Sequence, residues 1–160
     1  MRNLPARWCG LLLCVVSMFS QAGPVLEKVI DGDTVVIRDD TQTYHLRLLD
    51  IDAPELHQAY GKQAKRSLSS LCDTSIIVQP QGMDIYGRTL GRLICHDIDA
   101  SQHQIEQGMA WFNSRYSKRD DLKWLQVQAR QQKTGLWQQA RPMPPWIWRK
   151  RYGQHYHRQE

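Results

Sequence analysis

Between residues 25 and 49, β-branched and apolar positions alternate with polar ones, which is the pattern of short, half-buried β-strands. Three strands are predicted there, at residues 25–30, 34–37 and 44–49. The turn Asp31-Gly32-Asp33 joins the first two strands as a hairpin. In the third strand Leu46 and Leu48 share one face, so Arg47 lies on the other face and is carried by a rigid element.

Beyond residue 59 the apolar spacing changes to that of a helix. Tyr60, Ala64, Leu68 and Leu71 recur at helical spacing and predict a helix over residues 60–71. Two more strands are predicted at residues 76–79 and 89–95, with a turn at Pro80-Gln81-Gly82 after the first of them.

Cap signals then predict two C-terminal helices. Asp99 can cap a short helix that ends before Gly108. Asp120 or Asp121 can cap a longer helix that runs through Lys133 and stops at Gly135. The order is three strands, a helix, two strands and two helices. It indicates an α+β, mainly β protein built on a five-stranded OB-type barrel, with an open α+β sheet as the alternative.

The first 22 residues have the pattern of a signal peptide. Arg2 and Arg7 precede an apolar run, and Ser20-Gln21-Ala22 places small residues where a signal peptidase cleaves. The apolar run is too short for a typical transmembrane helix, although an uncleaved anchor is the alternative. We therefore expect an exported product, periplasmic or secreted, without stable membrane association.

Removal of the leader changes both the charge and the cysteine count. Loss of Arg2 and Arg7 lowers the formal net charge from +5 to +3, which permits a polyanionic partner without requiring one. Of the four cysteines only Cys72 and Cys95 remain. Export makes a disulfide between them plausible, and two buried free thiols are the alternative.

Acidic residues gather at two places that the predicted hairpins bring to one end of the sheet. One group lies at Asp31 and Asp33, and the other at Asp50, Asp52 and Glu55. Carboxylates so placed repel one another unless a cation lies between them, and hard divalent ions prefer such oxygen ligands. The nearby Arg47 indicates that an anionic species binds there too.

Three sequence blocks resemble the signatures of the thermonuclease (staphylococcal-nuclease-like) family. They are I-D-G-D-T at 30–34, R-L-L-D-I-D-A-P-E at 47–55 and D-I-Y-G-R at 84–88. Each block alone is a weak signal, but the three occur in order, and the likeness runs from about Val25 to Trp137, nearly the whole of residues 23–140, which we take as the nuclease domain.

This resemblance implies roles for individual residues. Asp33, Asp52 and the main-chain carbonyl of Ala53 would hold Ca²⁺. Glu55 would orient or activate the attacking water, and Arg47 and Arg88 would grip the phosphoryl oxygens with their planar donor groups. Without the resemblance, turn formation, helix capping and surface ion pairing would explain the same residues.

Two tyrosines resemble those that line the family's nucleotide pocket. Tyr86 would lie near a phosphate and Tyr116 under a base, although the loop before Tyr116 departs from the family pattern. A place in the apolar core is the alternative for both tyrosines.

Residues 141–160 form a Pro-, Trp- and Arg-rich extension. Its aromatic and basic residues alternate, a mixture that could stack on bases and neutralise phosphates. The simpler interpretation is a terminal segment that partly packs its tryptophans and otherwise frays.

The resemblance as a whole implies a calcium-dependent, sugar-nonspecific nuclease. Such an enzyme would be a monomer that hydrolyses DNA and RNA and leaves 3′-phosphate ends, with flexible or single-stranded regions favoured. A cleavage-inactive OB-type nucleic-acid-binding module is the main alternative, and a calcium-stabilised exported structural domain is another.

Overall fold

The structure is a computed structural model that describes residues 23–73 and 75–153. The predicted signal peptide and the last seven residues of the C-terminal extension lie outside these residues. Within the two described ranges, no helix combines the length and the apolarity that crossing a bilayer requires.

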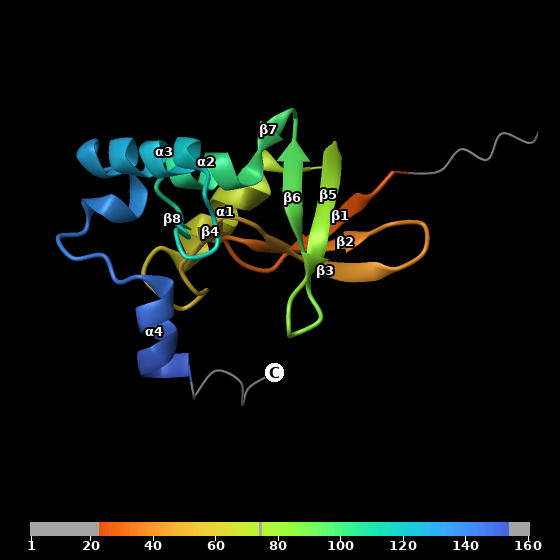
Figure 1. The fold of residues 1–160 in the computed structure, drawn as a ribbon, viewed down its shortest axis with the longest axis horizontal. Coiled ribbons are helices and arrows are strands. Elements are labelled where there is room, and N and C mark those ends of the chain that lie inside the picture. Colours follow the sequence, from red (N-terminus) through yellow and green to blue (C-terminus); the bar gives the residue numbers. More distant parts are fainter. Residues whose placement is uncertain (1–22, 74, 154–160) are drawn as a thin grey trace, which may run out of the picture.

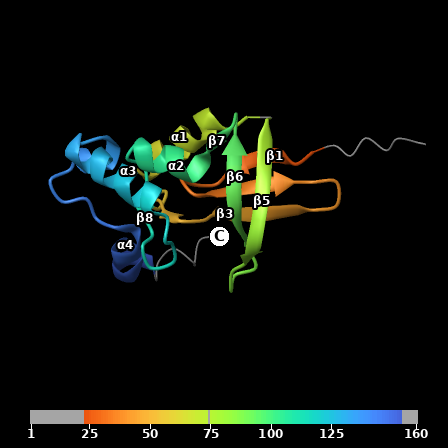
Figure 2. The same ribbon diagram turned by 45° about the horizontal axis from the view of Figure 1, so that its top comes forward.

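The main sheet is mixed. Its five principal strands, in spatial order, are β1 (Val25–Val29), β2 (Thr34–Arg38), β3 (Thr43–Leu48), β6 (Thr89–Cys95) and β5 (Ile76–Met83). The β3–β6 pair is parallel and the other neighbours are antiparallel, and the short β7 (Ile98–Asp99) is added beside β6. Figures 1 and 2 show β5 and β6 running across the direction of β1, β2 and β3.

The predicted strands are all present, but the sheet is not a closed barrel. Closure would require the free edge of β1 to pair with β5. In the described part of the chain β1 pairs with β2 alone, and β1 and β5 are the two edges of an open sheet. The OB-like α+β fold therefore holds, and the closed form of the barrel is not confirmed.

The predicted helices form together at one side of the sheet (Figure 1). They are α1 (Gly61–Leu71), α2 (Ala100–Glu106) and α3 (Asp120–Gln131), followed by the 3-10 turn η1 (Gly135–Gln138). A small second sheet, absent from the prediction, pairs β4 (Ile51–Asp52) with β8 (Trp111–Phe112). A fourth helix, α4 (Pro145–Tyr152), forms in the extension where the simpler interpretation expected a frayed end.

The helix boundaries follow local hydrogen bonding. Asp99 caps α2 as predicted, because its carboxylate accepts from the amides of Ser101 and Gln102. For α3 the cap prediction was wrong: Arg119 is the N-cap residue, and Asp121 lies in the first turn, where it pairs with the Arg119 guanidinium.

The turn predicted at Pro80-Gln81-Gly82 is also wrong, since β5 continues through it to Met83. The register shifts between Pro80 and Gly82, which marks a β-bulge. Because β5 is an edge strand, the missing N–H of Pro80 can be accommodated without breaking the sheet.

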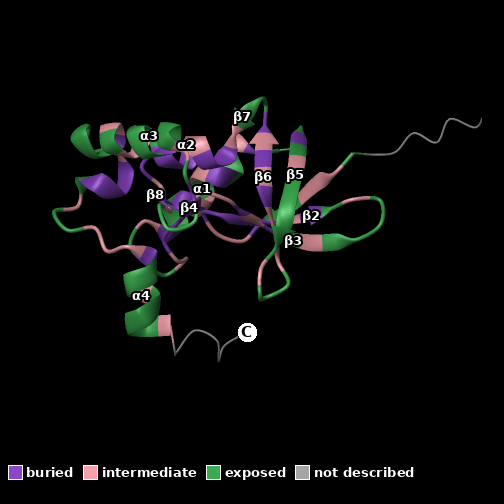
Figure 3. Ribbon diagram, viewed as in Figure 1, coloured by how far each residue is buried: buried purple, intermediate pink, exposed green. Residues whose placement is uncertain are grey.

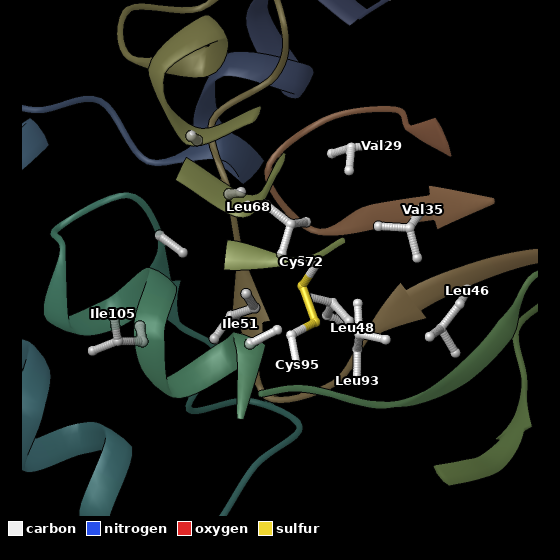
Figure 4. Close-up of a cluster of buried hydrophobic side chains, with 14 of the residues drawn as sticks. Val29, Val35, Leu46, Leu48, Ile51, Leu68, Cys72, Leu93, Cys95 and Ile105 are labelled. Atoms are coloured by element: carbon white, nitrogen blue, oxygen red, sulfur yellow. A yellow bond between two sulfur atoms is a disulfide. The ribbon is translucent and has the colours of Figure 1, made fainter. Parts of the chain in front are cut away.

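The core lies between the sheet and the helices, and a disulfide crosses it. Figure 3 shows the burial concentrated where β3, β6 and the helices meet. In Figure 4, Leu48, Leu68 and Leu93 surround the bond between Cys72 and Cys95, whose Cα atoms are 5.1 Å apart. The bond ties the end of α1 to the end of β6, so it holds the helical layer on the sheet.

Cys72→Ala/Cys95→Ala should lower the free energy of unfolding by about 3 kcal/mol, because it removes a cross-link that closes a loop of intermediate length. Urea denaturation of the oxidised protein and the double variant measures the difference. A pair of free thiols in the denatured, unreduced protein would contradict the bond.

Candidate active site

The site begins at the turn between β1 and β2, which brings Asp33 against the strand β4. Asp33 is buried, and its Oδ2 accepts a hydrogen bond from the amide of Ala53 at 2.6 Å. Gly32 permits this approach: a Cβ at that position would lie 2.7 Å from the Cβ of Ala53. This contact spans 20 residues of sequence and brings Asp33 of one predicted acidic group next to Asp52 of the other, whereas Asp50 pairs with Arg119.

Arg47 joins the two buried aspartates. Its Nη2 lies 3.0 Å from Asp33 Oδ2 and 3.1 Å from Asp52 Oδ1. Its Nη1 donates to the main-chain carbonyls of residues 48 and 51. The strand β3 thus places the guanidinium between the carboxylates, with its side chain only 14% exposed.

The carboxyl group of Asp33 has an unusual environment. Burial raises its pKa well above the ordinary value of 3.8, and Arg47 opposes this shift through its positive charge. The nearby Asp31 and Asp52 add to the increase. A second cation beside Asp33 would therefore stabilise its ionised form.

Glu55 follows β4, and hydrogen bonds with Gln58 fix its backbone. Its amide donates to Gln58 Oε1 at 3.2 Å, and its carbonyl accepts from the Gln58 amide at 2.8 Å. Gly61 packs against this turn so closely that a Cβ would lie 1.9 Å from the Glu55 carbonyl oxygen. Glu55 is half-buried beside Asp52, where it can face a small ligand.

Arg149 of α4 enters the same site. Its Nη2 lies 2.7 Å from Asp52 Oδ2, and its Nη1 lies 3.1 Å from Asp52 Oδ1 and 2.8 Å from Glu55 Oε1. Burial opposes the charge on Arg149, but the hydrogen bonds and ion pairs with Asp52 and Glu55 raise its pKa above the ordinary value. Arg149 is therefore a charged partner of both predicted site carboxylates.

Arg88 pairs with Asp84 and not with the carboxylates of this cluster. Arg88 immediately precedes Thr89, which pairs with Leu46 in the β3–β6 ladder, so it adjoins the strand pair that carries Arg47. Its guanidinium binds Asp84 at 2.7 Å and is a third exposed. Burial raises the pKa of Asp84, but hydrogen bonds from the amide and guanidinium of Arg88 and from the amide of Tyr86 outweigh it, so the pKa lies below the ordinary value.

The two predicted pocket tyrosines are at the surface, which excludes the core alternative for both. Tyr86 is 77% exposed, and the Arg88 guanidinium lies 5.7 Å from its ring centre. Tyr116 is 78% exposed and lines a cavity of about 400 Å³ that also has Asp52, Asn113, Trp146 and Arg149 in its walls. This cavity connects Tyr116 to the carboxylate cluster.

The donor chemistry of the cluster suits a hard cation. Asp33 and Asp52 offer buried carboxylate oxygens at one point, and the main chain of Ala53 runs between them. Arg47 and Arg149 neutralise these oxygens, so the cluster is built to face positive charge. In the described ranges, no three His, Cys, Asp or Glu side chains are already arranged around one ion position.

Sequence reasoning missed two residues of the site. Arg149 is one of several basic residues in the segment 141–160 and no pattern singles it out, although Pro144-Pro145 before it is a helix-start signal. Gln58 carried no signal, yet it joins the Glu55 turn to the carbonyl of Met143 at 2.6 Å.

The OB-like α+β fold brings buried carboxylates and guanidinium groups together at one point, and these are the groups that can bind a cation and an anion such as a phosphate. Comparison with known proteins narrows the class of protein. Residues 45–139 match the family described as staphylococcal nuclease homologue.

Relatives agree with this match. An "Uncharacterized endonuclease" from Escherichia coli is 40% identical over 126 residues, covering 78% of this chain and 82% of the relative. A "Micrococcal nuclease" from Shigella flexneri is 35% identical over 135 residues, covering 77% and 78%. A "Probable staphylococcal-like nuclease CAN1" from Oryza sativa is 36% identical over 108 residues, covering 67% and 33%. The chain belongs to the staphylococcal nuclease family of phosphodiester hydrolases.

Proposed function

We propose that this enzyme is an exported, calcium-dependent, sugar-nonspecific nuclease that hydrolyses DNA and RNA and leaves 3′-phosphate ends. The observation that carries the proposal is the convergence of Asp33 and Asp52 on Arg47, next to Glu55. Few structural roles require two buried carboxylates and more than one guanidinium group at a single point, whereas phosphodiester hydrolysis requires both charges.

Each residue predicted at the site has a role in this proposal. Asp33, Asp52 and the main-chain carbonyl of Ala53 would hold Ca²⁺, which supplies positive charge to a phosphate oxygen when bound. Glu55 orients the attacking water and can accept its proton. Arg47 and Arg88 donate to the phosphoryl oxygens, whose negative charge grows as water adds to phosphorus and the 5′-oxygen departs.

The surface around the site favours substrates with accessible bases. Tyr116 is exposed, so an unpaired base can stack on its ring, and stacking depends little on base identity, while the exposed Tyr86 would lie near a phosphate. We therefore propose that single-stranded or flexible regions of DNA and RNA are preferred, and that the enzyme acts as a monomer. Export rests on the signal peptide predicted at residues 1–22.

A plasmid-nicking assay with and without Ca²⁺ tests the proposed function. The purified protein should convert supercoiled DNA to nicked and linear forms in Ca²⁺, and excess chelator should abolish this while the circular dichroism spectrum stays unchanged. Cleavage that persists in chelator would remove the calcium role.

The alternatives give different results in the same assay. A cleavage-inactive binding module would retard the plasmid in a gel but leave it supercoiled. A calcium-stabilised structural domain would neither retard nor cut it, and chelation would lower its melting temperature. Extension of the cleaved product by a DNA polymerase tests the predicted 3′-phosphate. The polymerase should extend the product only after a 3′-phosphatase has removed the phosphate.

A further inference from the structure

The helix α4 is an addition to the matched family region that docks on the active site. The family match ends at residue 139, and α4 begins at Pro145. Gln58 binds the carbonyl of Met143 just before α4, and the ring of Trp146 packs edge-on against Trp111 at 6.5 Å. Figures 1 and 3 show α4 set apart from the other helices, with most of its surface exposed.

The strongest contact of α4 with the enzyme body is made by Arg149. Its two terminal nitrogens bind both oxygens of Asp52, and one of them also binds Glu55. Arg47 already donates to Oδ1 of Asp52. Arg149 therefore occupies the carboxylate oxygens that a hard cation needs as ligands.

Charge balance indicates that Arg149 and a divalent cation compete for this place. With Asp33, Asp52 and Glu55 ionised, the two guanidinium groups leave the connected cluster with a net charge of −1. A divalent cation added to that cluster would create an excess of positive charge in a half-buried site. Without Arg149, the same cation would make the cluster neutral, so cation binding favours release of Arg149.

We propose that Arg149 is a built-in competitor of the cation, which holds Asp52 and Glu55 in the cation-free enzyme and is displaced when the ion binds. Arg149 then sets the cation concentration at which the site fills, and α4 moves away from Glu55 as the site becomes active. The inference rests on the proposed cation site at Asp33 and Asp52. Release is feasible because the Arg149 side chain is 45% exposed and α4 buries only Pro145 completely.

Calcium titration calorimetry on the chelator-stripped full-length protein tests the competition. Arg149→Gln should bind Ca²⁺ at least about tenfold more tightly than the wild type, because no ion pair must first be broken. Arg151→Gln is the matched control, since it removes the same charge from an exposed position on the same helix, and its affinity should stay within about twofold of the wild type. Asp33→Asn removes a proposed ligand without touching Arg149 and should not bind the ion.

Hydrogen–deuterium exchange gives a second readout that does not depend on activity. In the wild type, Ca²⁺ should speed exchange at the amides of residues 146–152, and in Asp33→Asn it should not. In Arg149→Gln these amides should exchange fast without the ion.

The outcomes separate this inference from the proposed function. If the wild type binds Ca²⁺ and Asp33→Asn does not, but Arg149→Gln binds no more tightly or α4 becomes more protected with Ca²⁺, the competition is wrong and the cation site stands. Tighter substrate binding by the wild type than by Arg149→Gln at equal Ca²⁺ affinity would mean that Arg149 stays in place as a phosphate contact. If neither the wild type nor Arg149→Gln binds the ion, both proposals fall.

Discussion

Arg47→Lys should lower the turnover number by at least about a hundredfold, equivalent to roughly 3 kcal/mol of transition-state stabilisation. Arg47 uses its planar group to bind Asp33, Asp52 and two main-chain carbonyls, and an ammonium group cannot make all these contacts from one position. The variant should also lose stability, because one of two buried carboxylates would lack a partner. Single-turnover kinetics on an oligonucleotide and a thermal melt measure the two effects.

Arg88→Lys separates catalysis from structure. It should lose turnover by a similar factor of about a hundred, yet its stability should hardly change, because Arg88 is a third exposed and its guanidinium pairs with the neighbouring Asp84 and lies near the ring of Tyr86. Arg38→Lys is the matched control, since Arg38 forms a similar exposed pair with Glu27 away from the site. Near-normal rates in both Arg47→Lys and Arg88→Lys would show that neither guanidinium contacts the phosphate.

Asp33→Asn should abolish calcium binding and reduce cleavage by at least about a hundredfold, while leaving the cation-free protein as stable as the wild type or more so. The fold accommodates the amide, because Ala53 can still donate to the carbonyl oxygen of Asn and Thr34 can accept from its nitrogen. The variant removes a carboxylate that burial makes unfavourable at neutral pH.

The pH dependence of this stability difference has a definite sign. Because burial raises the pKa of Asp33, the folded protein binds more protons than the unfolded chain between 3.8 and that higher pKa. The wild-type contribution of Asp33 is therefore present below 3.8 and is lost as pH rises through the folded pKa. Asn does not titrate, so the melting temperature of the variant minus that of the wild type should increase with pH over this window.

Melting curves for both proteins in chelator, taken from acid to neutral pH, measure the difference. Other titrating groups are common to the two proteins and largely cancel in the comparison. A variant that becomes progressively less stable than the wild type as pH rises would show that Arg47 outweighs burial at Asp33, which would contradict the prediction.

Local patterns were enough to predict the five principal strands, the first three helices and one cap. The alternation around Arg47 fixed the faces of β3, and both Leu46 and Leu48 are buried as that pattern requires. Asp99 caps α2 because a cap is formed within a few residues of sequence. Where competing contacts came from elsewhere, local signals failed, as at the bulge in β5 and at the start of α3.

By itself the sequence determined the order of the five principal strands and the first three helices, the family, and which carboxylates and arginines belong to its motifs, because each of these depends on residue spacing along the chain. Only the tertiary structure decided that the sheet is open, that Arg47 lies between Asp33 and Asp52, and that Arg149 binds Asp52 across 97 residues of sequence. The physical reason is that ion pairing and sheet closure depend on distances between segments, and those distances are set by how the whole chain packs.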